Sequence, residues 1–192
     1  NDFLKHIPKE SNILDLGCGS GRDSLEFIKR GYNITAVDGS KELSIAASKI
    51  IGQEVIFNKF EDLQLTEKFH GIWACASLLH INKRDLINVI KNISSNLEDN
   101  GVFYMSFKYR EDEYIDEKGR YFNCYTEETF KEMILAVPKL EIIKIYKSED
   151  TIGGRNNLQW LNVLLKINWS YKNGYIMIFK ENHYIPLNYV KI

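Results

Sequence analysis

The stretch ILDLGCGSGR, residues 13–22, decides the fold of this chain. Its apolar first part, Ile13–Leu16, fits a buried strand, and three glycines at alternate positions come after it. Glycine lets a backbone turn tightly and approach a ligand to distances that a Cβ would forbid. A plain strand-to-helix turn needs one glycine, and it gives no reason for Asp15 at the end of a buried strand. The stretch therefore predicts a ligand-binding turn between a first strand and a first helix.

Strand-like and helix-like segments alternate around this turn, from Asn12 to about Leu165. This alternation is typical of a Rossmann-like, mostly parallel α/β sheet with helices on both faces. We expect seven strands, the last one antiparallel because no helix separates it from the strand before it. The predicted strands are 12–16, 33–37, 54–58, 71–75, 102–107, 140–146 and 158–166, with a turn at Asn100-Gly101. The predicted helices are 21–29, 40–50, 83–97 and 126–137, the last capped by Thr126.

The composition changes after Lys166, where aromatic and β-branched residues surround a turn at 172–174. We therefore expect a main domain over residues 1–166 and a small C-terminal β-meander over 167–192. The meander is either an appendage of the main sheet or the start of a further domain.

Charge and cysteine content exclude several classes of protein. The 192 residues carry 25 basic and 26 acidic side chains, so no overall field attracts nucleic acid or an anionic membrane. The three cysteines, Cys18, Cys75 and Cys124, lack CxxC spacing, which argues against a disulfide framework and a zinc site. No apolar segment approaches the roughly 20 residues of a membrane span, and no signal-peptide pattern is present. We expect a cytoplasmic protein without metal, as a monomer or weak dimer.

A second acid, Asp38, ends the second predicted strand. In mononucleotide-binding α/β folds an acid at this position accepts hydrogen bonds from a ribose diol. The alternative is that Asp38 caps the next helix, a position for which Ser40 is better suited. We therefore expect Asp38 to bind a ribose.

The glycine spacing separates two classes of cofactor. A dinucleotide fingerprint reads GxGxxG, whereas this chain reads GxGxG with an acid two residues before the first glycine. The sequence resembles class I S-adenosylmethionine-dependent methyltransferases over roughly residues 12–166. Their first motif, Asp/Glu-x-Gly-x-Gly-x-Gly, is matched by Asp15, Gly17, Gly19 and Gly21.

The resemblance implies S-adenosylmethionine as cofactor, with the glycine loop against its methionine part, Asp15 ordering that loop and Asp38 on the ribose. Arg22 opposes the helix dipole and needs an anionic partner, either the methionine carboxylate or Asp23. The segment 60–62 matches the place where the family surrounds the adenine. The implied cofactor residues are Asp15, Gly17, Cys18, Gly19, Ser20, Gly21, Arg22, Asp38, Gly39, Ser40, Phe60, Glu61, Ala76 and Ser77.

The segment ACASLLHI, residues 74–81, resembles the fourth motif of a methyltransferase branch that includes tellurite-resistance-type enzymes. Small residues at the end of a strand leave room for a ligand in the crevice of an α/β sheet. His80 could deprotonate an acceptor, line its pocket, or serve a structural role. Arg155 could meet an anionic acceptor or be a solvated loop residue.

Methyl transfer needs alignment of the acceptor and exclusion of water rather than a nucleophilic triad or metal. The polar insert 108–123 mixes both charge signs and predicts a lid, with Tyr109, Tyr121 and Arg155 closing over a compact ligand. The alternative is a solvated surface loop without contact to the substrate. No lysine-rich stripe interleaved with aromatic residues suits nucleic acid. We expect a small-molecule or small oxyanion acceptor. A nicotinamide-dependent oxidoreductase and a non-catalytic cofactor-binding module are the alternatives.

Overall fold

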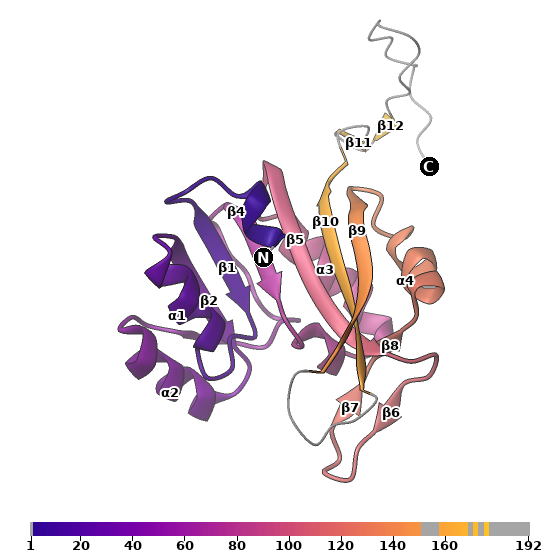
Figure 1. Ribbon diagram of the computed structural model, residues 1–192, viewed down its shortest axis with the longest axis horizontal. Coiled ribbons are helices and arrows are strands. Elements are labelled where there is room, and N and C mark those ends of the chain that lie inside the picture. The colour runs from indigo at the N-terminus through magenta and orange to yellow at the C-terminus, as the bar shows by residue number, and fades with distance from the viewer. Residues whose placement is uncertain (1, 151–157, 169–170, 173–174, 177–192) are drawn as a thin grey trace, which may run out of the picture.

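The computed structural model describes residues 2–150, 158–168, 171–172 and 175–176. A twisted central sheet runs in the order β3-β2-β1-β4-β5-β10-β9, with β8 paired to β5 (Figure 1). Its strands are β1 (Asn12–Leu16), β2 (Asn33–Asp38), β3 (Ile56–Phe57), β4 (Phe69–Ala74), β5 (Leu97–Tyr109), β8 (Cys124–Tyr125), β9 (Leu140–Glu149) and β10 (Gln159–Ile167). The predicted Rossmann-like fold is confirmed, with the two-residue β8 added to the seven expected strands.

The central strands of the sheet are parallel, whereas β10 runs antiparallel to its neighbours. β1 pairs parallel to β2 and β4, and β4 pairs parallel to β5. β10 is antiparallel to both β5 and β9, which confirms the expected antiparallel last strand. The strand order reverses between β1 and β4, the point where open α/β sheets bind their ligands. The loops after these two strands are therefore the first place to look for a site.

Helices cover both faces of the sheet (Figure 1). They are α1 (Arg22–Lys29), α2 (Lys41–Ile51), α3 (Lys83–Ser94) and α4 (Glu127–Ile134), with short 3-10 helices η1 (Phe3–His6) and η2 (Leu78–His80). Buried side chains of η1, α1 and α2 form one apolar cluster, and those of α3 and α4 form the other. None of the helices in the described part of the chain is long and apolar enough to cross a membrane.

Local capping explains where these helices begin. The Ser40 side chain accepts a hydrogen bond from the Leu43 N–H and starts α2. Thr126 accepts one from the Thr129 N–H and starts α4, as predicted. Each such cap stabilises its helix by about 1 kcal/mol.

The predicted turn at Asn100-Gly101 is wrong, because β5 already begins at Leu97. Phe69 of β4 pairs with Leu97 and Gly71 pairs with Val102, so residues 98–101 form an irregularity within the strand. Leu97 is buried in the core from this strand, and α3 therefore ends at Ser94 rather than at residue 97. Helical spacing of Leu97 had suggested a longer helix.

The polar insert 108–123 is an ordered hairpin of β6 (Tyr114–Ile115) and β7 (Tyr121–Phe122). Beyond the main sheet, β11 (Tyr171–Lys172) and β12 (Tyr175–Ile176) pair antiparallel, which is one part of the expected meander. The rest of that meander, like the Arg155 loop, lies outside the described residues. The domain boundary after Lys166 stays a prediction.

Candidate active site

The glycine loop after β1 has a left-handed backbone at all three glycines, with φ of 82° at Gly17, 56° at Gly19 and 80° at Gly21. The N–H groups of Gly17 and Cys18 donate to the Val37 carbonyl over 2.8 and 3.1 Å, which ties the loop to β2. Ser20 is exposed at the tip of the turn. The loop is therefore held in a conformation that side chains disfavour.

The glycines serve different purposes. A Cβ on Gly17 would lie 2.3 Å from the Ser77 Cβ, so close packing requires glycine there. A Cβ on Gly21 would lie 3.0 Å from the Ile51 side chain of α2. A Cβ on Gly19 would meet no atom within 4 Å. Gly19 thus borders open space, where a ligand can approach the backbone.

Asp15 is 2% exposed, and its carboxylate accepts a hydrogen bond of 2.5 Å from the Ser24 hydroxyl. It joins the end of β1 to the first turn of α1, and so supports the loop through the helix that comes after it. Burial raises the pKa of Asp15 to about 7, although the Ser24 hydrogen bond opposes this shift. Ser24 was not among the residues predicted for the site.

Asp38 links the glycine loop to α2. Its Oδ2 accepts from the Gly19 N–H and its Oδ1 accepts from the Ser40 N–H, both over 2.8 Å. The side chain is 8% exposed, and each carboxylate oxygen keeps capacity for a further hydrogen bond. Gly39, beside it, is exposed. Ser40 caps α2 as expected, so Asp38 does not cap the helix with its own side chain.

Arg22 pairs with its neighbour Asp23 over 2.7 Å, which is one of the two partners considered for it. This hydrogen bond raises the pKa of Arg22. Asp23 also accepts a 2.9 Å hydrogen bond from the Trp73 indole N–H, which anchors the pair to β4. The Arg22 side chain itself remains largely exposed.

The segment after β4 crosses the glycine loop. The Ser77 hydroxyl donates to the Leu16 carbonyl over 2.6 Å, and the Phe60 ring lies 3.1 Å from the position of a Gly17 Cβ. Ala76 has φ of 53°, a left-handed value that is rare outside glycine. Its N–H donates to the Ser106 hydroxyl at 2.8 Å. Such strain costs roughly 1 kcal/mol or more and persists where surrounding contacts hold it.

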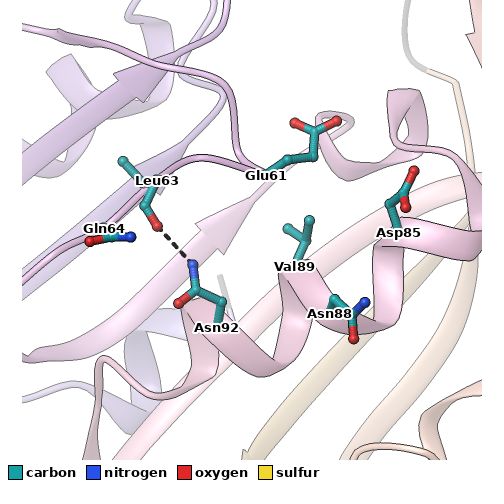
Figure 2. Close-up of a pocket in the computed structure, with 7 residues that line it drawn as sticks. All are labelled: Glu61, Leu63, Gln64, Asp85, Asn88, Val89 and Asn92. Carbon is teal, nitrogen blue, oxygen red and sulfur yellow. Dashed lines mark hydrogen bonds between the residues drawn. The ribbon is translucent and has the colours of Figure 1, made fainter.

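Glu61 comes directly after Phe60 in the chain. It borders a cavity of about 440 Å³ between the segment 61–64 and α3 (Figure 2). The Asn92 amide closes one side of this cavity by donating to the Leu63 carbonyl over 2.7 Å. Two carboxylates and three amides border it together with two apolar side chains: Glu61, Leu63, Gln64, Asp85, Asn88, Val89 and Asn92.

A second cavity, of about 320 Å³, lies at the carboxyl ends of β4 and β5. It is lined by Ala76, Leu79, His80, Lys108, Arg120, Phe122, Leu158 and Trp160. Ala76 belongs to the segment that crosses the glycine loop, so this cavity lies next to the glycine loop. We refer to this space as the β5 cavity.

His80 has a defined orientation in the β5 cavity. Its Nδ1 lies 2.8 Å from the Tyr121 carbonyl oxygen, and its ring makes an edge contact with Phe122 at 4.7 Å. A carbonyl only accepts, so Nδ1 carries the proton in this contact. Nε2 of the neutral ring is then left as an acceptor. His80 therefore lines the β5 cavity, and its role as a base stays a prediction.

Sequence reasoning missed most of the cavity lining. Lys108, Arg120 and Phe122 line the cavity, whereas Tyr109 and Tyr121 were expected to cover the ligand. The Tyr109 ring lies under Lys147, and the Tyr121 hydroxyl donates to Glu113 over 2.6 Å. Burial raises the pKa of Tyr121 to about 12. Neighbours along a strand face opposite sides, and only the hairpin pairing decides which side meets the cavity.

Comparison with known proteins agrees with this geometry. Residues 13–101 match the family described as a methyltransferase domain. Over these residues the chain is similar to a methyltransferase domain. The matched residues include the glycine loop, Asp38, Phe60 and the segment after β4, and the match favours methyl transfer over the oxidoreductase alternative.

Two curated relatives are methyltransferases by name. A putative methyltransferase YqeM from Bacillus subtilis is 30% identical over 116 residues, which cover 55% of this chain and 47% of the relative. The chain thus spans about half the length of that relative. An uncharacterized methyltransferase from Staphylococcus carnosus is 22% identical over 164 residues, covering 82% of this chain and 79% of the relative.

Several solved structures share the fold of this chain. A methyltransferase from Methanosarcina mazei has a TM-score of 0.75 at 17% identity, and the match covers 85% of this chain and 95% of the Methanosarcina mazei chain. The 1,6-didemethyltoxoflavin-N1-methyltransferase from Burkholderia thailandensis has a TM-score of 0.72 at 20% identity, and the match covers 86% of this chain and 75% of that enzyme. Its structure was solved with 1,6-didemethyltoxoflavin and S-adenosylhomocysteine bound. TehB from Haemophilus influenzae has a TM-score of 0.68 at 18% identity, and the match covers 87% of this chain and 60% of TehB.

Proposed function

We propose that this chain transfers the methyl group of S-adenosylmethionine to a small-molecule acceptor. The observation that carries the proposal is the Asp38 carboxylate. It is bonded to the Gly19 N–H, beside open space, at the point where the strand order reverses. The matching family, a methyltransferase domain over residues 13–101, supports the same activity.

The residues present fit the cofactor. The open space over Gly19 suits the methionine part, and the free capacity of the Asp38 oxygens suits two ribose hydroxyls. Phe60 supplies an apolar surface beside the loop. When bound, S-adenosylmethionine supplies a methyl group that is already activated for displacement.

The chain itself aligns the acceptor and excludes water. Ser106 holds the strained Ala76 backbone between the glycine loop and the β5 cavity. The cavity volume of about 320 Å³ suits a small molecule rather than a macromolecule. The 1,6-didemethyltoxoflavin bound to the Burkholderia thailandensis enzyme supports such an acceptor.

Kinship with the tellurite-resistance-type branch stays a prediction. TehB is one neighbour among several with comparable TM-scores. We also propose a reducing, cytoplasmic location, which the three free cysteines Cys18, Cys75 and Cys124 support.

Calorimetry tests the proposal. The purified chain should bind S-adenosylhomocysteine and show no measurable binding of NAD. Asp38→Ala should weaken binding at least about tenfold, since each lost charge-assisted hydrogen bond is worth roughly 1.5–3 kcal/mol. The exposed lid acid Asp112 provides the matched control, Asp112→Ala, with unchanged affinity.

Equal affinity of Asp38→Ala and the parent would rule out the ribose assignment. Binding of S-adenosylhomocysteine without any methylated product, across a panel of small hydroxyl and amine compounds, would instead favour a non-catalytic cofactor-binding module.

A further inference from the structure

We propose that the β5 cavity binds a small aromatic acid and that His80 takes the proton from the hydroxyl or N–H group that becomes methylated. This inference rests on the proposed methyl transfer and names its class of acceptor. Three observations support it: the cations of the β5 cavity, its apolar lining and the orientation of His80.

Lys108 is the first reason for an anionic acceptor. The side chain is half-buried, and its Nζ donates to the Tyr114 hydroxyl and lies 3.9 Å from the centroid of the Phe122 ring. Among the described residues no carboxylate lies within ion-pair distance of this ammonium group. A partly desolvated cation without a counter-charge is costly, and an anionic ligand offsets that cost.

The rest of the lining agrees with this charge. Arg120 adds a second cation, although Asp116 partly neutralises it over 2.6 Å. The described lining residues include no Asp or Glu. The cavity that Glu61 borders has the opposite character, with two carboxylates and no cation among its lining residues. Of these two cavities, only the β5 cavity has cations among its described lining residues.

The apolar lining of the cavity favours an organic ligand over an inorganic oxyanion. Five of the eight lining residues are apolar or aromatic: Ala76, Leu79, Phe122, Leu158 and Trp160. A bare oxyanion would leave these surfaces without contact. Aromatic and aliphatic walls around a few polar groups are typical of pockets for small organic molecules. A planar ring that carries a carboxylate uses both the walls and Lys108.

His80 supplies the proton acceptor. His80 lines the cavity, and because its Nδ1–H is held by the Tyr121 carbonyl, Nε2 of the neutral ring keeps a lone pair that can accept a proton. The acceptor's oxygen or nitrogen forms the new bond to the methyl carbon, and the carbon–sulfur bond breaks with its electron pair left on sulfur. The proton of the acceptor passes to Nε2 and then to water. The Tyr121 carbonyl stabilises the charged ring while it holds both protons.

The binding test uses the full chain saturated with S-adenosylhomocysteine. The probes are the hydroxybenzoates and aminobenzoates, each with its methyl ester as a neutral counterpart, together with tellurite. At least one acid should bind about tenfold more tightly than its ester. Lys108→Met should remove this difference while the affinity for the ester stays the same. Lys118, exposed in the same hairpin and outside the cavity lining, provides the control Lys118→Met, which should keep the preference.

Equal binding of every acid and its ester, or binding of tellurite alone, would overturn the proposal of an aromatic acid. Failure of the proposed methyl transfer shows itself separately, as absence of S-adenosylhomocysteine binding in the first titration or as absence of methylated product from an acid that binds.

A second variant tests His80. His80→Asn keeps an N–H donor close to the Nδ1 position for the Tyr121 carbonyl but lacks Nε2. Transfer to the acid that binds should slow by roughly 100-fold, while the dissociation constant of that acid changes less than about threefold. An unchanged rate would overturn the role of His80 as base, and weaker binding with an unchanged rate would make it only a wall of the cavity.

Discussion

Two buried acids at the ends of neighbouring strands have different tasks. Asp38 bonds to two backbone N–H groups and keeps capacity for a ligand, whereas Asp15 bonds to Ser24 inside the protein. Both were predicted from the sequence as site residues. Their different hydrogen-bond partners could not be predicted, because they depend on how α1 and α2 pack over the strand ends.

The raised pKa of Asp15 predicts a pH dependence of stability. Its pKa is about 7 in the folded chain and close to 4 when unfolded. Between these values the unfolded state has lost the proton and the folded state keeps it, so stability falls as pH rises from about 4 to 7. The total effect is on the order of 4 kcal/mol.

Urea unfolding of the parent and of Asp15→Asn, measured across this pH range, reports the effect. The difference in unfolding free energy between the two proteins should shift in favour of the variant as pH rises. A constant difference would show that Asp15 does not titrate in this range.

Gly19→Val should abolish cofactor binding. Gly19 has φ of 56°, a backbone angle that is unfavourable for a β-branched residue. The valine side chain would also enter the open space over the loop. Gly31 offers a matched control, because it has φ of 84° and no atom within 4 Å of a Cβ, yet lies at the far end of α1.

We expect Gly31→Val to lose stability but to bind S-adenosylhomocysteine as the parent does in calorimetry. Equal binding by both variants would mean that Gly19 does not border the cofactor.

At the scale of elements, local signals were sufficient where the chain is regular. Apolar alternation and the caps Ser40 and Thr126 placed β1, α2 and the start of α4 within about two residues. The start of β5 was missed because Leu97 fits a helical stripe, and only its pairing with Phe69 makes it part of a strand. The lining of the β5 cavity was missed for a related reason. Its Lys108, Phe122 and Trp160 come from separate strands whose facing is decided by long-range pairing.

Gly71 of β4 carries a prediction about how η1 packs on the sheet. A Cβ there would lie 2.3 Å from Ile7 Cδ1 and 2.6 Å from Phe3 Cζ. Gly71→Ala should therefore push η1 off the sheet and lower the unfolding free energy by roughly 1–3 kcal/mol. Urea unfolding measures this loss.

Gly39→Ala is the matched control for Gly71→Ala, since its nearest neighbour would be the Asn58 carbonyl at 3.9 Å. If Gly71→Ala were as stable as the control, the close packing of η1 on β4 would be disproved.

At the scale of the whole molecule, we expect the site to depend on the main sheet and not on the residues C-terminal to it. Ile167, the last residue of β10, pairs with Leu140, and the Asn168 N–H donates to the Lys139 carbonyl over 2.7 Å, so the backbone hydrogen bonds of this strand pair extend to Asn168. A chain that ends at Asn168 should keep the parent's melting temperature within a few degrees and its affinity for S-adenosylhomocysteine within about twofold.

Differential scanning calorimetry and titration on the shortened chain test this expectation. Loss of the cooperative melting transition would show that residues after Asn168 belong to the same folding unit.

The position of β10 between β5 and β9 has a consequence for the order in which the protein matures. Pairing between strands far apart in sequence forms late, and both neighbours keep an open edge until residues 159–167 have been synthesised. The segments predicted to hold the methyl donor are complete long before this point. Leu158 and Trp160, which wall the β5 cavity, belong to the segment that arrives last. A nascent chain can therefore acquire its donor site before it has a place for the acceptor.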